Sequence, residues 1–545
     1  MLNRRDFLGT IGGAGLAAAS TAANAATTAG KPNLILILAD DMGFSDAGCF
    51  GGEIDTPNLD RMASTGLRFT QMYSTARCGP SRNCLMTGYY AQQTACDVMT
   101  PGKVPAYTRF IPEYLKPLGY RSYHSGKWHL KFVTGQAGVG FDHSYNMMDE
   151  LRFFTQRRHE LDGEPLPTPG PGYYSTTAIS DYAVGFLKEH QKQYAAQPFF
   201  LYLAPHAPHF PLQAPAEDIA RYKDRFAEGW DTARERKLQK MQRMGLVNCG
   251  LAPLEPNMWT KWNTPDDELR EKVGPGEVTR AVPWSTLSLE QKRFQSSKMA
   301  IHAAMVSRMD LEIGKVLDQV KAMGAEENTV VMFLSDNGAS SEQLIRGDGH
   351  DKTAPLGSAA THLGLGPGWA SNSNAPFRLH KSWVNEGGIS SPMIVSGGKA
   401  SLAANKLRHN PCHFVDVLPT FVELAGGKPG AIVDSPAPAR QGLSLASVLQ
   451  TDNTAQHDYL YFNHNNNRAI RLGDWNAVAT GLSGPWELFD LSLDRGEQRN
   501  QAASQPARVQ KMAEIWQRHD EEFVAVRESA QPTTKSRIKA GAAAA

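Results

Sequence analysis

The sequence is poor in cysteine, and its cysteines form no recognisable cluster. Six are present in 545 residues: Cys49, Cys78, Cys84, Cys96, Cys249 and Cys412. No two of them form a C-x-x-C pair, so their spacing gives no zinc site. In an oxidising compartment some could pair, but the spacing names no partner.

The sequence also lacks an excess of charge of one sign. Its 56 lysine and arginine residues almost balance 55 aspartate and glutamate residues, for a formal net charge of +1. The composition therefore does not favour nucleic acid or an anionic membrane as a partner, and a small anionic ligand would need local cations. With 41% hydrophobic and 20% charged residues, the chain has the composition of a large globular α/β protein with an appendage.

The N-terminal apolar segment is too short and too weakly hydrophobic to span a bilayer comfortably. Residues 1–25 contain Arg4 and Arg5, then a run rich in Gly and Ala, then Ala-Asn-Ala at 23–25. This layout predicts a twin-arginine signal peptide cleaved after about Ala25, with a short membrane anchor as the alternative. We expect the twin-arginine machinery to export the protein, which would then be periplasmic or secreted.

Strands and helices alternate along the expected main domain. The segments NLILILADD (33–41), QPFFLYLAPHAPHFPLQAP (197–215) and NTVVMFLSDNG (328–338) each have the pattern of a buried strand that runs into polar residues. Residues 298–323 carry apolar side chains at helical spacing. This alternation predicts an α/β fold with a large, mostly parallel sheet flanked by helices, whose ligands bind beyond the carboxyl ends of the strands.

Changes in composition divide the chain into regions. The main domain is expected over residues 31–430, with a charged, tryptophan-bearing insertion at 221–291 that folds over it. Short strand-like segments, followed by an amphipathic run at 506–523, predict a smaller α+β C-terminal subdomain over residues 431–527. The tail, residues 528–545, is expected to be disordered.

Two pairs of oxygen-bearing residues stand at the ends of predicted strands. Asp40 and Asp41 follow the first apolar segment, and Asp336 and Asn337 follow the last. Oxygen donors of this kind suit Ca²⁺ or Mg²⁺ rather than zinc or copper. Either pair alone is better explained by a turn or a helix cap, but two pairs at corresponding strand ends favour a cation site.

A second candidate centre is the stretch CGPSRNCLMTG at 78–88. Pro80 suits the first turn of a helix, and free backbone N–H groups there would stabilise negative charge beside Cys78. A thiolate nucleophile would use a histidine base and an oxyanion hole, and it has no need of a hard cation, which binds sulfur poorly. An oxygen species at position 78 would fit these surroundings better than sulfur.

The stretch C-x-P-S-R followed by L-M-T-G resembles the signature of the type I sulfatases, the formylglycine-dependent branch of the alkaline phosphatase superfamily. GYRSYHSGKWHL, APHFPLQAP, LSDNGA, GPGW, PFRLHKSWVNEGGISSP and WELFDL follow in the order of that family, and the set is most similar to the bacterial arylsulfatases. The resemblance implies an alkaline-phosphatase-like sulfatase fold and hydrolysis of an aryl or sugar sulfate ester. It also implies that a formylglycine-generating enzyme converts Cys78 to Cα-formylglycine, whose hydrated aldehyde is the nucleophile and carries a covalent sulfate during turnover.

The resemblance assigns roles to individual residues. The cation, Ca²⁺ or alternatively Mg²⁺, would be held together with residue 78 by the oxygen-bearing side chains at the strand ends: Asp40, Asp41, Asp336 and Asn337. Arg82 and Lys127 would stabilise the hydrated aldehyde. His209 and Lys381 would protonate or shield the departing oxygen, and His129 would take the proton from the remaining hydroxyl.

Two other functions remain open at this point. Relatives with a similar metal site and the same C-x-P-S-R cleave phosphonate monoesters or phosphodiesters, although the export signal favours sulfate. An unmodified, inactive protein that binds metal or sulfate would keep an intact thiol at Cys78. The pair Asn83 and Cys84 departs from the small apolar residues typical of the family, and it lies where the modifying enzyme reads the chain.

Overall fold

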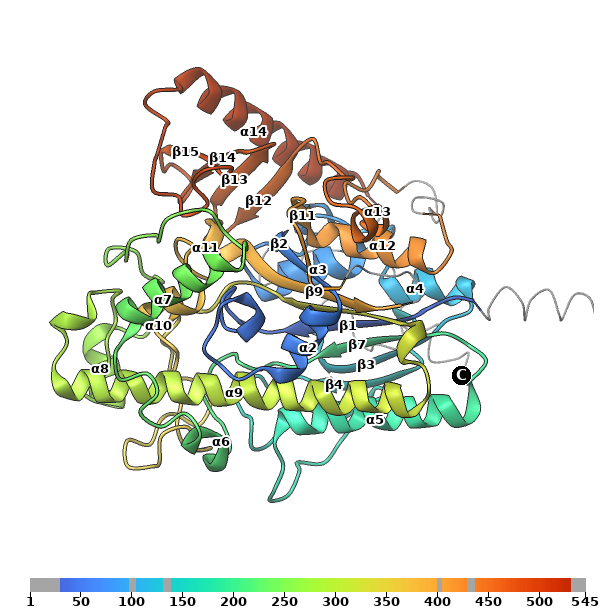
Figure 1. Ribbon diagram of the computed structural model, residues 1–545, viewed down its shortest axis with the longest axis horizontal. Coiled ribbons are helices and arrows are strands. Elements are labelled where there is room, and N and C mark those ends of the chain that lie inside the picture. Colours follow the sequence, from blue (N-terminus) through green and yellow to red (C-terminus); the bar gives the residue numbers. More distant parts are fainter. Residues whose placement is uncertain (1–29, 98–103, 131–138, 399–403, 429–436, 531–545) are drawn as a thin grey trace, which may run out of the picture.

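The computed structural model describes residues 30–97, 104–130, 139–398, 404–428 and 437–530 (Figure 1). The predicted signal peptide and residues 531–545 of the predicted tail lie outside these ranges. Within them, no helix is both long and apolar enough to cross a membrane.

An 11-stranded sheet forms the centre of the molecule, in the order β10-β2-β9-β8-β1-β7-β3-β4-β5-β6, with β11 paired to β2. Its central strands β8, β1, β7, β3 and β4 run parallel, while β9 is antiparallel to both β2 and β8. The strands are β1 (Asn33–Ala39), β2 (Leu67–Tyr73), β3 (Arg121–Lys127), β4 (His143–Met147), β5 (His159–Leu161), β6 (Glu164–Pro165), β7 (Phe199–Ala204), β8 (Thr329–Ser335), β9 (Ser390–Gly397), β10 (Lys406–Arg408) and β11 (Cys412–His413). The three strands predicted from the sequence, β1, β7 and β8, are neighbours in the middle of this sheet.

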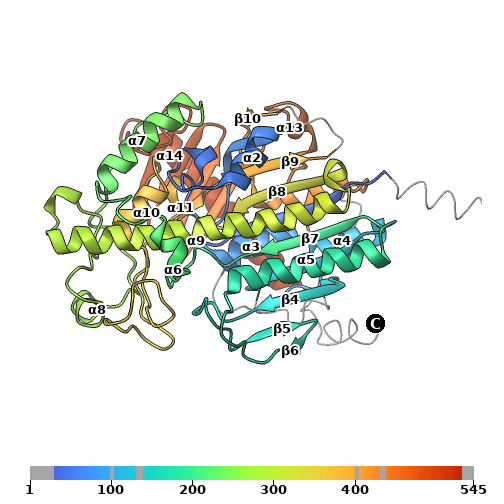
Figure 2. The same cartoon turned by 60° about the horizontal axis from the view of Figure 1, so that its bottom comes forward.

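Successive side chains of the central strands enter two different cores, because residues along a strand point alternately to its two faces. On β1, Ile35 and Ile37 pack into one core and Leu34 and Leu36 into the other. The first core is covered by α2 (Pro57–Thr65), α5 (Ser175–Gln193) and α9 (Leu289–Ala322), and the second by α3 (Cys78–Thr87), α4 (Ile111–Leu115) and α12 (Val417–Leu424). Figures 1 and 2 show α5 and α9 side by side along their face.

Helix α9 is longer than the predicted segment 298–323, and it begins inside the predicted insertion. Its first turn is closed by a capping box: the Ser288 hydroxyl accepts from the Gln291 amide, and the Gln291 side chain accepts from the Ser288 amide. The helix therefore starts at Leu289, directly after its N-cap Ser288, although its first two turns carry few apolar side chains.

The predicted insertion contains helices α7 (Trp230–Arg243) and α8 (Asp266–Val273) and contributes no strand to the sheet. Trp230 on α7 meets the rings of Trp284 and Trp369 edge-on, with centroids 4.7 and 5.5 Å away. Trp369 lies on α10 (Pro367–Ser373), which belongs to the main domain. The insertion is thus packed on the main core rather than standing apart from it. Two further short helices of the main domain are α6 (Ala216–Ala220) and α11 (Glu386–Ile389).

A separate four-stranded antiparallel sheet follows α13 (Ala446–Gln450) and lies at the top of Figure 1. Its strands are β12 (Leu460–His464), β13 (Asn467–Leu472), β14 (Trp475–Ala479) and β15 (Trp486–Asp490), and α14 (Pro506–Ser529) covers it. Phe523 of α14 stacks on Tyr90 of the main domain at 5.4 Å. The start of the disordered tail at residue 528 is wrong, because α14, held by this packing, continues to Ser529. The predicted α/β class, with its large mostly parallel sheet and smaller C-terminal α+β part, is confirmed.

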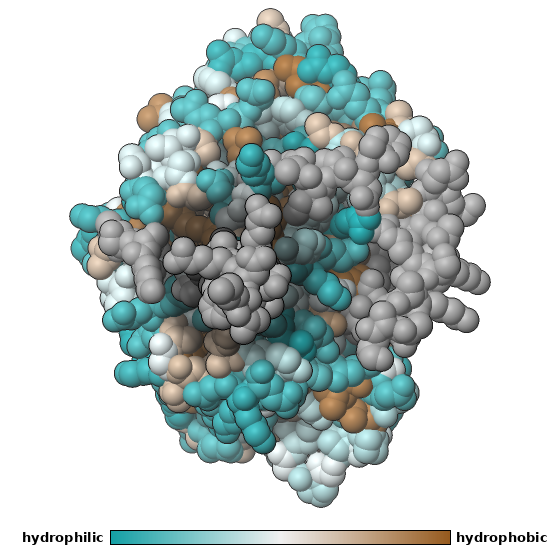
Figure 3. Space-filling view, turned by 90° about the vertical axis from the view of Figure 1, so that its right-hand side faces the viewer, coloured by the Kyte–Doolittle hydropathy of each residue, from teal (hydrophilic) through white to brown (hydrophobic). Residues whose placement is uncertain are grey.

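The face shown in Figure 3 is mainly hydrophilic, with apolar residues in small scattered groups. Across the described residues, the most exposed large apolar side chains are Trp259, Trp262, Leu289, Leu311, Leu482 and Leu493. The two tryptophans lie only three residues apart, within the insertion. The other four are separated along the chain.

Candidate active site

The sheet brings both predicted pairs of oxygen donors to one place. Strands β1 and β8 are parallel neighbours with Ala39 opposite Ser335, so the residues that follow them leave the same edge of the sheet. The backbone N–H of Asp41 donates to Asp336 Oδ1 at 3.3 Å, and Asn337 Nδ2 donates to Asp41 Oδ1 at 2.7 Å. Asp40, Asp41, Asp336 and Asn337 are all buried.

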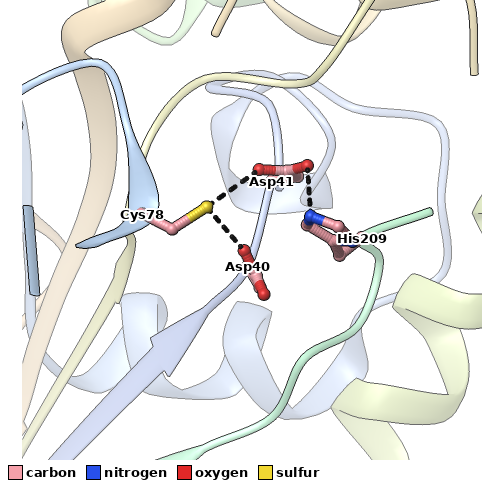
Figure 4. Close-up of side chains that lie close together, drawn as sticks. All are labelled: Asp40, Asp41, Cys78 and His209. Atoms are coloured by element: carbon pink, nitrogen blue, oxygen red, sulfur yellow. Dashed lines mark hydrogen bonds and ion pairs between the residues drawn. The ribbon is translucent and has the colours of Figure 1, made fainter. Parts of the chain in front are cut away.

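Cys78 lies at the first position of α3, directed at these carboxylates (Figure 4). Its Sγ is 3.4 Å from Asp40 Oδ1 and 3.9 Å from Asp41 Oδ1. His209, which follows β7, completes the group, with Nε2 3.7 Å from Asp41 Oδ2. One ligand atom from each of these four residues lies within 4.8 Å of the others.

The environment of Cys78 suppresses thiolate formation. Burial raises the pKa of the thiol well above its usual value, and the negative charges of Asp336 and Asp40 raise it further against the opposing charge of Lys381. The thiol is therefore protonated at neutral pH, and a protonated thiol is a poor nucleophile. The position of Cys78 at a helix N-terminus does not reverse this.

Buried cations balance the carboxylates. Lys127, at the end of β3, places Nζ 2.5 Å from Asp40 Oδ2 and 2.9 Å from Glu150 Oε2. Arg82, one turn after Cys78 on α3, places a guanidinium nitrogen 2.8 Å from Asp336 Oδ2. Burial alone would raise the pKa of Asp40, but Lys127 and Arg82 outweigh it and hold that pKa well below its usual range.

Lys381 is a further buried cation of the site, paired with Asp41. Its Nζ lies 2.7 Å from Asp41 and 3.5 Å from Glu342 Oε2. Glu342 also pairs with Arg77, the residue before Cys78, at 3.0 Å. Burial opposes the charge on Glu342, but Arg77 and Lys381 hold its pKa below the usual range.

Burial keeps the rings of both predicted catalytic histidines neutral. It lowers the pKa of His129 to about 3 and also lowers that of His209. His129 sits in the left-handed region with φ 57° and directs Nδ1 at Glu150, but at 3.7 Å the contact is too long for a hydrogen bond. His209 Nδ1 lies 2.6 Å from the Phe210 carbonyl oxygen, which fixes the proton of the neutral ring on Nδ1.

The residues present fit a hard divalent cation. Three carboxylates and one carboxamide converge, and Asn337 Oδ1 is buried without a hydrogen-bond partner. Burial and the nearby charge of Asp40 raise the pKa of Asp336 to about 7, so the carboxylates repel each other where they meet. A cation among these oxygens would relieve that repulsion, and it would use the free carboxamide oxygen.

The structure brings together all the residues that the sequence predicts for this site: Asp40, Asp41, Cys78, Arg82, Lys127, His129, His209, Asp336, Asn337 and Lys381. Three further charged residues of the same site were not predicted from the sequence: Arg77, Glu150 and Glu342. Arg77 could have been suspected from its place next to Cys78, and Glu342 from its place five residues after Asn337. Glu150 follows β4 in a segment without a recognisable motif, and only the pairing of β4 with β3 brings it to Lys127.

Comparison with known proteins agrees with this geometry. The sulfatase family model matches residues 32–427. A sulfatase of Schizosaccharomyces pombe is 30% identical over 541 residues, which cover 89% of this chain and 93% of the relative. An arylsulfatase of Klebsiella aerogenes is 31% identical over 456 residues, covering 77% and 92%. The solved structure of Ps i-CgsB with k-i-k-neocarrahexaose has the same fold, with a TM-score of 0.63 at 23% identity over 94% of this chain and 98% of that one.

The family match spans the large sheet and includes every side chain of the site described above. Both relatives are covered over more than nine-tenths of their length, so the likeness is not confined to one motif. The chain belongs to the sulfatase family and is a sulfuric ester hydrolase.

Proposed function

We propose that this sulfatase hydrolyses aryl or sugar sulfate esters with Cα-formylglycine, formed from Cys78, as its nucleophile and with a divalent cation, most simply Ca²⁺. The observation that carries the proposal is the mismatch at Cys78: a buried, protonated thiol directed at an all-oxygen cation site. The Klebsiella relative, named an arylsulfatase, supports the aryl part of the assignment.

The cation would be held by Asp40, Asp41, Asp336 and Asn337. Formylglycine supplies an aldehyde whose hydrate offers an oxygen nucleophile, and the cation supplies positive charge beside the sulfate. Residue 78 lies within 3.9 Å of two of the four donors, so the nucleophile and the cation would share one small volume.

The charged side chains of this chain orient the reacting groups. Arg82 and Lys127 hold positive charge beside residue 78 through their pairs with Asp336 and Asp40. Lys381 is held in its charged form, because Asp41 outweighs the effect of burial and raises its pKa. Lys381 is therefore better suited than the neutral His209 to neutralise charge on a departing oxygen.

The histidines handle protons in our proposal. His129 is neutral, so one of its ring nitrogens has a lone pair that can accept a proton; burial opposes this protonation, and the negative charge of Glu150 favours it. His209 can donate a proton only after it has taken one, which the negative charge of Asp41 favours and burial opposes. We therefore assign proton acceptance to His129, and shielding with conditional proton donation to the pair Lys381 and His209.

We also propose that the protein acts in the periplasm or outside the cell. This rests on the twin-arginine pattern of residues 1–25. A fusion of these residues to a reporter that is active only after export tests it, with Arg4→Lys and Arg5→Lys together as the non-exported control.

The mass of the peptide that contains residue 78 tests the proposed nucleophile. Protein isolated from its native host should carry an aldehyde in place of the thiol, and an intact Cys78 in active protein would overturn the proposal. A panel of aryl sulfate, sugar sulfate, phosphonate monoester and phosphodiester then tests the reaction. Sulfate esters should be cleaved fastest, whereas a dominant phosphonate rate would favour the alternative hydrolase.

A further inference from the structure

Trp262 is an exposed aromatic ring whose orientation is fixed. The side chain is 40% exposed, yet its Nε1 donates to Glu342 Oε1 at 2.5 Å. The guanidinium carbon of Arg77 lies 5.5 Å from the ring centroid. An incidental surface tryptophan would be free to change rotamer, whereas this one is held at its nitrogen and against a cation.

The two groups that hold Trp262 belong to the active site. Glu342 directs its other oxygen at Lys381, which pairs with Asp41 at 2.7 Å. Arg77 is the neighbour of Cys78 in the chain and also donates to Ser382 Oγ at 2.9 Å. Two ion pairs, Glu342 with Lys381 and Lys381 with Asp41, therefore link the carboxylate that holds the indole to a proposed cation ligand.

Three hydrogen bonds hold the loop that carries Trp262 against the segment that follows β8. The Thr264 amide donates to the Gln343 carbonyl, and the Gln343 amide donates to Asn263 Oδ1, both at 3.0 Å. The Ile345 amide donates to Thr264 Oγ1 at 3.3 Å. The position of the ring relative to the oxygen donors is thus set, before any ligand binds, by hydrogen bonds from backbone amides to one carbonyl and two side chains.

We propose that Trp262 binds the leaving group of the substrate and favours sulfate esters whose alcohol part is an aromatic ring. The inference rests on the sulfate ester hydrolysis proposed above and names its substrate class. The polar groups beside the indole, Arg77 and Glu342, are engaged with each other and with Ser382 and Lys381. Arg77 lies over the ring, so what the residue offers a ligand is the part of the indole that stays exposed, and this aromatic surface suits an aromatic partner better than a chain of methylenes.

Three substrates and three variants test this. Nitrophenyl sulfate, glucosamine sulfate and hexyl sulfate supply an aromatic ring, a sugar ring and no ring. Trp262→Ala should lower kcat/KM for nitrophenyl sulfate about three- to tenfold, as expected for one lost aromatic stack, and leave hexyl sulfate within about twofold. Trp262→Phe keeps a ring but not the Nε1 donor, and it should retain most of the preference.

Trp259→Ala is the matched control. Trp259 lies three residues away on the same loop and is 46% exposed, but its ring faces Arg280 at 4.7 Å rather than the site. This substitution should leave all three substrates unchanged. A selective loss with Trp259→Ala but not Trp262→Ala, or an equal loss on all substrates with Trp262→Ala, would overturn the inference. A loss confined to glucosamine sulfate would overturn the aromatic preference.

A binding measurement separates this inference from the proposed function. In the Cys78→Ala background, which cannot turn over, calorimetry should show about three- to tenfold weaker binding of nitrophenyl sulfate when Trp262→Ala is added, with no change for hexyl sulfate. Equal binding of nitrophenyl sulfate by Cys78→Ala with and without Trp262→Ala overturns the assignment of Trp262. Wild-type protein that binds as expected but cleaves no sulfate ester would instead contradict the proposed function alone.

Discussion

The ammonium nitrogen of Lys127 lies 2.5 Å from a carboxylate oxygen of Asp40, and neither side chain is exposed to solvent. Lys127 also neutralises Glu150 at 2.9 Å. Two carboxylates from different elements, the end of β1 and the segment after β4, therefore depend on one buried cation. Removing that cation would leave Asp40 with only a longer contact to Arg82, at 3.8 Å, and would take from Glu150 its closest charged partner.

We expect Lys127→Met to destabilise the protein by about 3–5 kcal/mol, since breaking a buried pair strands its partner. Urea titration measures this, and turnover should fall in parallel. Lys272→Met is the matched control: its Nζ is also 2.5 Å from a carboxylate, Glu268, but the two side chains are 49% and 44% exposed. That substitution should cost less than about 1 kcal/mol. Equal costs for the two variants would contradict the importance of the buried pair.

Calcium should raise the melting temperature, and a chelator should lower it. Because Asp336 has a pKa of about 7, it carries charge above that pH and repels Asp40 unless a cation lies between them. At a hundredfold excess over its dissociation constant, calcium should add about 2.7 kcal/mol of stability. Differential scanning calorimetry with EDTA, Ca²⁺ and Mg²⁺ measures the shift.

Asp336→Asn should abolish this calcium response. In the metal-free protein the substitution removes the repulsion with Asp40 but also the buried ion pair with Arg82, so the calcium shift, and not the metal-free stability, is the readout. Asp348→Asn, at a carboxylate that is 59% exposed and paired with Arg152 and Arg157, should leave the calcium response intact. A full calcium shift in Asp336→Asn would place the cation elsewhere.

His129→Asn should lower kcat by about 10²–10⁴, the usual range for loss of a positioned acid or base. Asparagine tolerates the left-handed backbone at this position, where φ is 57°, so the fold should be retained. Steady-state kinetics together with circular dichroism distinguish loss of chemistry from loss of structure. A variant with unchanged kcat would remove His129 from the proposed mechanism.

Glu497 should make stability fall as pH rises. It is buried beside Asn385 and the Glu386 backbone, which donate to its Oε2, and burial together with the charge of Glu386 raises its pKa to about 8 from an ordinary 4.5. Between these values the folded state holds a proton that the unfolded state has lost. The free energy of unfolding should therefore drop by up to about 1.4 kcal/mol per pH unit across this window.

Glu497→Gln should remove that slope, so its stability relative to the wild type should increase from pH 5 to pH 8 in urea titrations. Gln498→Ala changes the adjacent, uncharged residue and should retain the wild-type slope. Parallel pH profiles for the wild type and Glu497→Gln would show that this carboxyl does not hold its proton in the folded state.

The sequence predicts the centre of the fold well, because β1, β7 and β8 are continuous apolar runs that end in polar residues. Their placement in a mostly parallel sheet is enough to bring Asp40 and Asp336 to one edge. The beginning of α9 is less evident in the apolar pattern, since its first turns are polar and depend on the capping pair Ser288 and Gln291. That pair is itself visible in the sequence as a capping box.

Two contacts around the site cannot be predicted from the sequence in the same way. Glu150 reaches Lys127 only because β4 pairs with β3, and nothing local to Glu150 shows this. Glu342 and Trp262 meet across 80 residues, through the docking of the insertion on the segment after β8. Such contacts arise from tertiary packing, so residue type and spacing along the chain do not reveal them.

The burial of α3 has a consequence for the order in which the protein is made. Cys78 is 2% exposed, and most of its helix is enclosed between the large sheet and α12, leaving an external enzyme no access to the thiol once the chain has folded. The proposed conversion of Cys78 must therefore be completed on the nascent or still unfolded polypeptide. Under this proposal, conversion of Cys78 competes with folding, and a molecule that folds first keeps a buried thiol where the proposed chemistry requires oxygen.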